Sequence, residues 1–210
     1  MTQQLKRFDW IAAGQSNGPD ALCDVPVYAN SEIVVLPTLG AIVPSWVLVV
    51  PRQCSVSLSV LSKSSRASIL EVGMDAATVM ENDGSAILFE HGPSNSESVV
   101  GCGVDQAHLH VVASKLDFVS SALSAPGVDW SSADRDDPWE GIDGREYYLI
   151  KTPSAAFIGY PRTPVSQFFR RHIALTAGVP ECWDYKKWPN YENIRRTYEQ
   201  FKGRVGAGAA

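Results

Sequence analysis

A short segment in the middle of the chain places three polar side chains at alternate positions, and two of them are histidines. The segment reads Gly101-Cys102-Gly103-Val104-Asp105-Gln106-Ala107-His108-Leu109-His110-Val111-Val112. Gln106, His108 and His110 would share one face of a strand, and the apolar residues between them would share the other. Side chains on one face of a strand are roughly 6.5 to 7 Å apart. Two imidazoles at that spacing can reach one phosphate or one metal ion.

Two glycines precede these polar residues. Glycine lets a backbone approach a ligand closely, or form a bulge before a strand, and we therefore expect Gly103 to contact a phosphate. A simple turn is the other interpretation of the glycines. An exposed sheet face that happens to carry two histidines is the other interpretation of the motif.

The pattern resembles the motif of the histidine-triad (HIT) superfamily, in which three histidines alternate with apolar residues and two apolar residues follow. His108 falls at the central position and His110 at the last, while Gln106 stands where the first histidine would be. Residues 31–40 and 43–52 resemble the paired early strands of the family, but the histidine usual after Pro51-Arg52 is absent. The further segments that resemble a bacterial branch are 88–92, 166–171, 183–185 and 192–194, so the likeness covers roughly residues 20 to 200.

The resemblance implies a protein that binds a nucleotide and attacks its α-phosphate. A neutral imidazole held in one tautomer can act as the nucleophile, and His108 matches that role, with His110 holding phosphate oxygens. Gln106 can donate hydrogen bonds but cannot deliver a proton at neutral pH. Either another group protonates the leaving group, for which His91 is the candidate, or the leaving group needs no proton. A surface position is the alternative interpretation of His91.

Four other residues are candidates for binding the nucleotide or its phosphate. Asn95 lies in a small polar loop before the motif. Gln167, Arg170 and Arg171 lie near an expected helix N-terminus, where backbone N–H groups and a bidentate cation attract anions. The alternative is that the arginines are solvated or pair with acidic loops.

Three hypotheses about function stay open. The first is an enzyme, a nucleotide hydrolase or nucleotidyltransferase that forms a covalent nucleotidyl-histidine and needs no metal or other cofactor. The second is a nucleotide-binding protein without turnover, because Gln106 and Cys54 stand where the family has histidines. The third is a metal site made by His91, His108 and His110, which are a plausible zinc set, although no fourth ligand is evident.

The rest of the chain must position these residues, and its pattern indicates an α+β fold. Strands are expected near 26–30, 32–37, 45–50, 86–90 and 106–113, followed by a hairpin over 146–160. Helices are expected over 62–80 and 117–124, from Thr163-Pro164 to Ala177, and from Asn190 onwards. An acidic loop is expected over 128–146. The resemblance implies an antiparallel sheet that carries the motif on an interior strand, with a long helix packed across it. We expect an irregular segment over 1–20, a HIT-like domain over 21–160, a C-terminal helical extension over 161–202 packed on it, and a disordered tail over 203–210.

Composition limits the partners. The chain has 210 residues and a net charge of −5, and no basic cluster marks it for nucleic acid. Pro37, Gly40 and Pro44 interrupt the uncharged stretch 33–50, so it does not read as a membrane helix. No secretory signal is visible, and the four cysteines show no paired spacing. We expect a cytoplasmic protein that binds a small-molecule nucleotide and neither nucleic acid nor membrane; the resemblance implies a homodimer.

Overall fold

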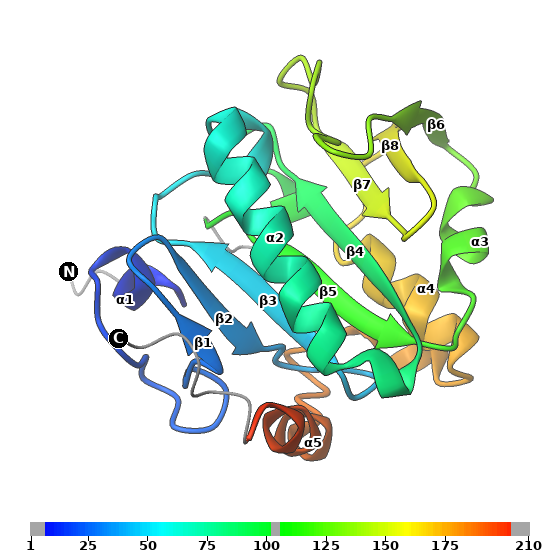
Figure 1. The fold of residues 1–210 in the computed structure, drawn as a ribbon. Helices are drawn as coiled ribbons and strands as arrows, with labels where there is room; N and C mark the ends of the chain where they lie inside the picture. The colour runs from blue at the N-terminus through cyan, green and yellow to red at the C-terminus, as the bar shows by residue number, and fades with distance from the viewer. Residues whose placement is uncertain (1–6, 102–105, 203–210) are drawn as a thin grey trace.

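An eight-stranded antiparallel sheet forms the centre of the molecule (Figure 1). The structure is a computed structural model that describes residues 7–101 and 106–202, so the tail over 203–210 lies outside the described residues. The strand order is β1-β2-β3-β5-β4-β7-β8-β6. The strands are β1 (Tyr28–Ala29), β2 (Ile33–Pro37), β3 (Trp46–Pro51), β4 (Ser85–Gly92), β5 (Leu109–Ser114), β6 (Val128–Ala133), β7 (Tyr147–Lys151) and β8 (Ala156–Pro161).

The motif strand β5 lies inside the sheet, between β3 and β4, and this confirms the interior position that the family resemblance implied. His110 stands opposite Leu48 on β3 and Phe89 on β4. The strand begins at Leu109, however, and not near residue 106 as predicted. The pairing with β3 ends at Leu109, and the backbone N–H of Ala107 donates to the Ser55 carbonyl outside the ladder.

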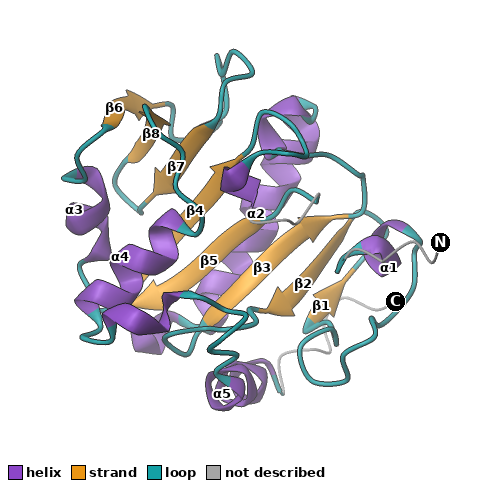
Figure 2. Cartoon of the chain, turned by 180° about the vertical axis from the view of Figure 1, so that it is seen from behind, coloured by secondary structure: helices purple, strands orange, loops and turns teal. Residues whose placement is uncertain are grey.

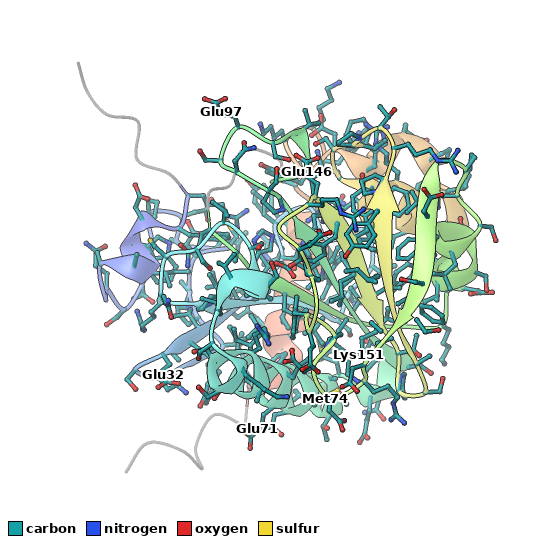
Figure 3. All side chains as sticks on the ribbon, turned by 90° about the horizontal axis from the view of Figure 1, so that it is seen from above. Glu32, Glu71, Met74, Glu97, Glu146 and Lys151 are labelled. Carbon is teal, nitrogen blue, oxygen red and sulfur yellow. The ribbon has the colours of Figure 1, made fainter. Side chains whose placement is uncertain are left out.

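One face of the sheet is covered by the long helix α2 (Lys63–Val79), which crosses it as predicted (Figure 1). The Ser62 hydroxyl caps its N-terminus by accepting a hydrogen bond from the Ser65 N–H. Gly73 faces the motif strand so closely that a Cβ there would lie 3.4 Å from Leu109 and Val111 side-chain atoms. Glu71 and Met74 lie on the outer side of this helix in Figure 3, so α2 is amphipathic.

The opposite face has two separate covers, which Figure 2 shows from behind. The helices α3 (Phe118–Leu123) and α4 (Phe168–Thr176) cover one side, and Phe169 of α4 packs in a cluster with Trp46 and Phe89. The short helix α1 (Asp9–Ala12) belongs to the other cover, where Phe8 packs with Leu48. His108 and His110 lie at the gap between these covers, because Phe8 contacts the first ring and Phe89 stacks on the second.

The last helix, α5 (Tyr191–Phe201), begins after Asn190 as predicted and packs its buried residues against the sheet. Its Asn193 side chain donates hydrogen bonds to the carbonyls of Ala41 and Ile42, and the Thr197 hydroxyl accepts from the Ser45 N–H. The helix therefore holds the loop between β2 and β3 in place. No helix within residues 7–101 and 106–202 is both long and apolar enough to cross a bilayer.

Two expected elements differ in the structure. Residues 128–133 form strand β6 rather than part of an acidic loop, because Val128 and Trp130 alternate with exposed residues and pack beside the α4 cluster, while the strand pairs along β8. Helix α4 begins at Phe168 and not at Thr163. Gln167 before it is left-handed, with φ of 56°, and the Tyr148 hydroxyl bonds to both the N–H and the carbonyl of Val165.

Glu90 of β4 is buried on the α2 side of the sheet and joins three distant segments. Its carboxylate accepts hydrogen bonds from the Leu58 N–H at 2.7 Å, the Trp139 indole at 2.6 Å and the Tyr147 hydroxyl at 2.6 Å. Burial raises the pKa of Glu90 to about 7, against the opposing effect of these three donors. The loop that carries Trp139 is thus held to the sheet by a hydrogen bond to the ionisable side chain of Glu90.

Replacing Glu90 with glutamine should change how stability depends on pH. A raised pKa means that the folded chain keeps a proton which the unfolded chain releases. The contribution of protonated Glu90 to the free energy of unfolding is therefore complete below about pH 4.5 and is lost as pH rises towards about 7. The free energy of unfolding of the wild type minus that of Glu90→Gln should therefore fall by about 3 kcal/mol across this window. Urea unfolding at a series of pH values measures the difference, in which the contribution of the histidines cancels. A difference that does not vary with pH would contradict the assignment.

Candidate active site

A pocket lies on the face of the sheet opposite α2, with an empty volume of about 610 Å³ that includes the part open to solvent. Segments far apart in the chain contribute to its wall. The residues that matter below are Arg7, Phe8 and Thr38 from the first part of the chain, His91, Gln106, His108 and His110 from the middle, and Gln167, Arg170 and Tyr185 from the last part.

His108 is held in one tautomer by its own loop. Its Nδ1 lies 2.9 Å from the Gln106 carbonyl oxygen. A carbonyl only accepts hydrogen bonds, so Nδ1 carries the proton and Nε2 keeps its lone pair. Burial lowers the pKa of His108 to about 4; the bond to Gln106 acts in the opposite direction, and the charges of Arg7 and Arg170 lower it further. His108 therefore presents a neutral, unprotonated Nε2 at pH 7.

His110 is held in the opposite tautomer. The Trp46 indole N–H, which only donates, lies 3.1 Å from Nδ1 of His110, so the ring proton sits on Nε2. The ring stacks on Phe89 at a centroid distance of 4.6 Å and lies 4.9 Å from the ring of His108. Burial, then the neighbouring histidines and Arg170, hold the pKa of His110 well below its usual value. Beside the lone pair of His108, the pocket thus has a neutral N–H donor.

His91 also lines the pocket, and its Nε2 accepts a hydrogen bond from the Phe169 N–H at 3.2 Å. This contact satisfies one of the free N–H groups at the start of α4. Burial, with the charges of His108 and Arg170, lowers the pKa of His91 to about 3. The ring is therefore neutral at pH 7, and its geometry favours a role in holding α4 over the proton donation expected from the sequence.

Gln106 is buried, and its amide is used inside the protein. Nε2 donates to the Pro51 carbonyl at 2.6 Å and to the Gln53 carbonyl at 3.0 Å. These acceptors belong to the end of β3 and the turn after it, where the sequence lacks the histidine that the HIT resemblance led us to expect. The side chain fastens the loop whose carbonyl fixes the tautomer of His108.

The C-terminal candidates separate into two groups. Gln167 and Arg170 line the pocket and are buried, and Arg170 donates to the Gly40 and Leu39 carbonyls at 2.6 and 2.7 Å. Arg171 points elsewhere: its guanidinium stacks 3.5 Å from the ring of Trp183 and donates to Ser166.

The loop candidates are not brought into the pocket in the part of the chain that the structure describes. Asn95 is exposed, and its side chain turns back on its own loop by accepting from the Glu97 N–H. Figure 3 shows Glu97, on the same loop, at the outer edge of the molecule. Gly103 lies outside the described residues.

Several residues of the wall were not predicted as site residues from the sequence, and Arg7, Phe8 and Thr38 are three of them. Phe8 is buried, and its ring centroid lies 5.8 Å from that of His108. Arg7 lies beside it, and the Thr38 hydroxyl is buried without a hydrogen-bond partner among the described residues. The closely spaced apolar side chains of Phe8, Trp10 and Ile11 were the available signal that this segment packs.

Metal binding was the third hypothesis drawn from the sequence. The rings of His91 and His110 lie 5.9 Å apart, with hydrogen bonds on Nε2 of the first and Nδ1 of the second. Within residues 7–101 and 106–202, no group of three or more histidine, cysteine or acidic side chains is arranged to hold a metal ion.

The known proteins that resemble this chain do so at low sequence identity. No protein-family model matches the chain. The HTH-type transcriptional regulator DsdC of Escherichia coli (strain K12) is 23% identical over 186 residues, which is 85% of this chain and 59% of that protein. The chain thus spans less than two thirds of this curated relative, and such an identity does not assign it to a family.

The structural neighbours include HIT-like proteins. Yeast Ap4A phosphorylase is 14% identical with a TM-score of 0.44, and the match covers 92% of this chain and 78% of that one. A hypothetical histidine triad nucleotide-binding protein from Sulfolobus tokodaii is 14% identical with a TM-score of 0.35, covering 88% and 90%. A Hit-like protein from Bartonella henselae is 13% identical with a TM-score of 0.40, covering 54% and 82%. Function is therefore inferred from the pocket itself.

The two histidine tautomers should be visible in solution. Nitrogen-15 NMR of the imidazoles should show the proton of His108 on Nδ1 and that of His110 on Nε2. Because the pKa of His108 is about 4 and that of His110 is well below its usual value, both rings should stay neutral from about pH 8 to about pH 5. A ring of this pair that gains its proton near pH 6.5 would contradict the assignment.

Gln106→Leu should disturb the tautomer of His108 without removing any group from that ring. The change leaves the carbonyls of the buried Pro51 and of Gln53 without their donor, which costs about 1–3 kcal/mol, and frees the loop that carries the Gln106 carbonyl. NMR should then show a mixture of His108 tautomers. Gln53→Leu, the same change on an exposed side chain whose backbone carbonyl is retained, is the matched control. A single unchanged tautomer in Gln106→Leu would show that the side chain does not position the loop.

Proposed function

We propose that the protein binds a nucleotide and transfers its nucleotidyl group through a covalent intermediate on His108, as a nucleotide hydrolase or nucleotidyltransferase. The observation that carries the proposal is the pair of opposite tautomers in one pocket. The unprotonated Nε2 of His108 supplies a nucleophile, and the Nε2–H of His110 supplies a donor to a phosphate oxygen. Arg7 and Arg170 make the same pocket positive, which suits an anionic ligand.

In the proposed first step, the lone pair on Nε2 of His108 forms a bond to the α-phosphorus. The bond from phosphorus to the bridging oxygen breaks, and its electron pair leaves on that oxygen. The imidazole becomes positively charged. Its Nδ1 keeps its proton and continues to donate to the Gln106 carbonyl, whose partial negative charge stabilises the cation. In the second step, water or another acceptor attacks phosphorus and loses a proton, and the nitrogen–phosphorus electron pair returns to Nε2.

The leaving group of this reaction should need no proton. His91, His108 and His110 are neutral at pH 7 because their pKa values are lowered, and the amide of Gln106 already donates to two carbonyls. A phosphate, pyrophosphate, nucleotide or acyl phosphate can leave as an anion, whereas an amine cannot leave without protonation. The proposed substrates are accordingly nucleotide anhydrides rather than nucleotide amidates.

A nucleotide-binding protein without turnover is the second candidate. The same absence of a protonated acid among the three pocket histidines supports it. Turnover of a dinucleoside polyphosphate separates the two candidates. The homodimer and the cytoplasmic location expected from the sequence stay predictions.

His108→Ala should abolish turnover and leave nucleotide binding largely intact. Removing a nucleophile costs several orders of magnitude in rate, whereas most of the pocket wall is unchanged. In both proteins, AMP or GMP at about 100 times its dissociation constant should raise stability by about 2.7 kcal/mol, which a thermal melt detects. His172→Ala removes a half-buried histidine that bonds to Ser121 outside the pocket and serves as the matched control. More than a few per cent of the wild-type rate in His108→Ala would exclude the covalent route.

A further inference from the structure

The N-terminal segment is built into the pocket wall. Phe8 is 3% exposed and Ile11 is fully buried, and both pack in one cluster with Leu48 and its neighbours on β2 and β3. Arg52 fastens the short helix by donating from Nη1 to the Ile11 carbonyl at 3.0 Å. Residues 7–12 thus have a fixed place beside His108.

This packing brings the charge of Arg7 to the nucleophile. The guanidinium carbon lies 5.1 Å from the centre of the Phe8 ring, and that ring lies 5.8 Å from the ring of His108. Arg7 is among the residues that line the pocket. Its positive charge contributes to the lowered pKa of His108, after burial.

The hydrogen bonds of Arg7 are incomplete in the part of the chain that the structure describes. Nη2 is buried and has no hydrogen-bond partner there. Nη2 forms an ion pair at 3.5 Å with Oδ1 of Asp24, which is likewise buried without a hydrogen-bond partner among the described residues. Arg170, in contrast, donates to two carbonyls. A buried guanidinium N–H without a partner is costly, and an oxygen of a ligand would satisfy it.

On the basis of the proposed function, we propose that Arg7 binds an anionic group on the leaving-group side of the substrate, so that the substrate carries a further phosphate beyond the one that His108 attacks. The two imidazoles hold the attacked phosphate, and Arg7 stands beyond Phe8 on the N-terminal side. When the bond from phosphorus to oxygen breaks, the electron pair stays on the leaving phosphate, and the guanidinium stabilises that charge without transferring a proton. Arg7 thereby offsets the lack of a protonated acid.

Binding to a variant that cannot turn over tests this directly. In His108→Ala, calorimetry should show that a nucleoside diphosphate binds roughly tenfold to a hundredfold more tightly than the corresponding monophosphate. Adding Arg7→Met should remove this difference, because it should lower the affinity for the diphosphate much more than the affinity for the monophosphate. Arg7→Lys should keep part of the difference, because the charge remains. The exposed Arg162, which also pairs with an aspartate, provides the matched control Arg162→Met.

Activity provides the second measurement, with two substrates that share one nucleotidyl group. A nucleoside triphosphate releases a phosphate chain, and the p-nitrophenyl ester of the nucleoside monophosphate releases an equally proton-independent anion without phosphate. Arg7→Met should lower kcat/KM for the triphosphate by roughly a hundredfold and leave the ester within about threefold of the wild-type value.

The outcomes separate the inference from the proposed function. The inference is overturned if the diphosphate still binds more tightly than the monophosphate in Arg7→Met. It is also overturned if the substitution lowers the affinity for both ligands by the same factor, because Arg7 would then not bind the further phosphate. If the difference depends on Arg7 but the wild type turns over neither substrate, the inference stands and the proposed catalysis fails. A chain that binds no nucleotide at all would remove both.

Discussion

The hydrogen bond from Nδ1 of His108 to the Gln106 carbonyl requires that this carbonyl be left out of the sheet. Had the ladder continued from Leu109 back to residue 106, the carbonyl would have been available to a neighbouring strand instead. The strand ends its pairing at Leu109, and the side chain of Gln106 binds residues 106–108 to the carbonyls of Pro51 and Gln53. The regular alternation of the motif directs the side chain of His110 into the pocket, whereas the break in the ladder fixes the tautomer of His108.

The electrostatics of the pocket follow from the same arrangement. Two covers on one sheet face bury the imidazoles, and each cover brings an arginine, Arg7 from the N-terminal side and Arg170 from α4. Burial and positive charge both disfavour a protonated imidazole, and the same positive charge attracts an anion. Under the proposed function, the environment that keeps His108 neutral for attack is therefore also the one that suits a phosphate ligand. The same burial and positive charge leave the three pocket histidines without the extra proton that an acid catalyst would donate.

Local pattern was sufficient for most of the fold and for part of the site. The alternation through His110, the serine cap of α2 and the hairpin of β7 and β8 could be read directly because each depends on neighbours in sequence. The start of α4 could not, because the left-handed Gln167 is set by contacts with distant residues. The structure also distinguishes two adjacent arginines of this helix: Arg170 lines the pocket, and Arg171 lies on the ring of Trp183. Arg7 was missed for a similar reason, since only tertiary packing places its segment beside the motif.

The C-terminal helices are needed for the pocket even though few of their side chains line it. Arg170 of α4 bonds to the carbonyls of Leu39 and Gly40, and Asn193 of α5 bonds to the next two carbonyls of the same loop. That loop begins with Thr38, whose buried hydroxyl belongs to the pocket wall. A loop outside the sheet loses conformational entropy when it is ordered. These four carbonyl contacts help to hold it, together with the hydrogen bonds from the Gly40 N–H to the Pro189 carbonyl and from the Ser45 N–H to the Thr197 hydroxyl. This part of the pocket wall is therefore held by residues near the C-terminal end of the chain.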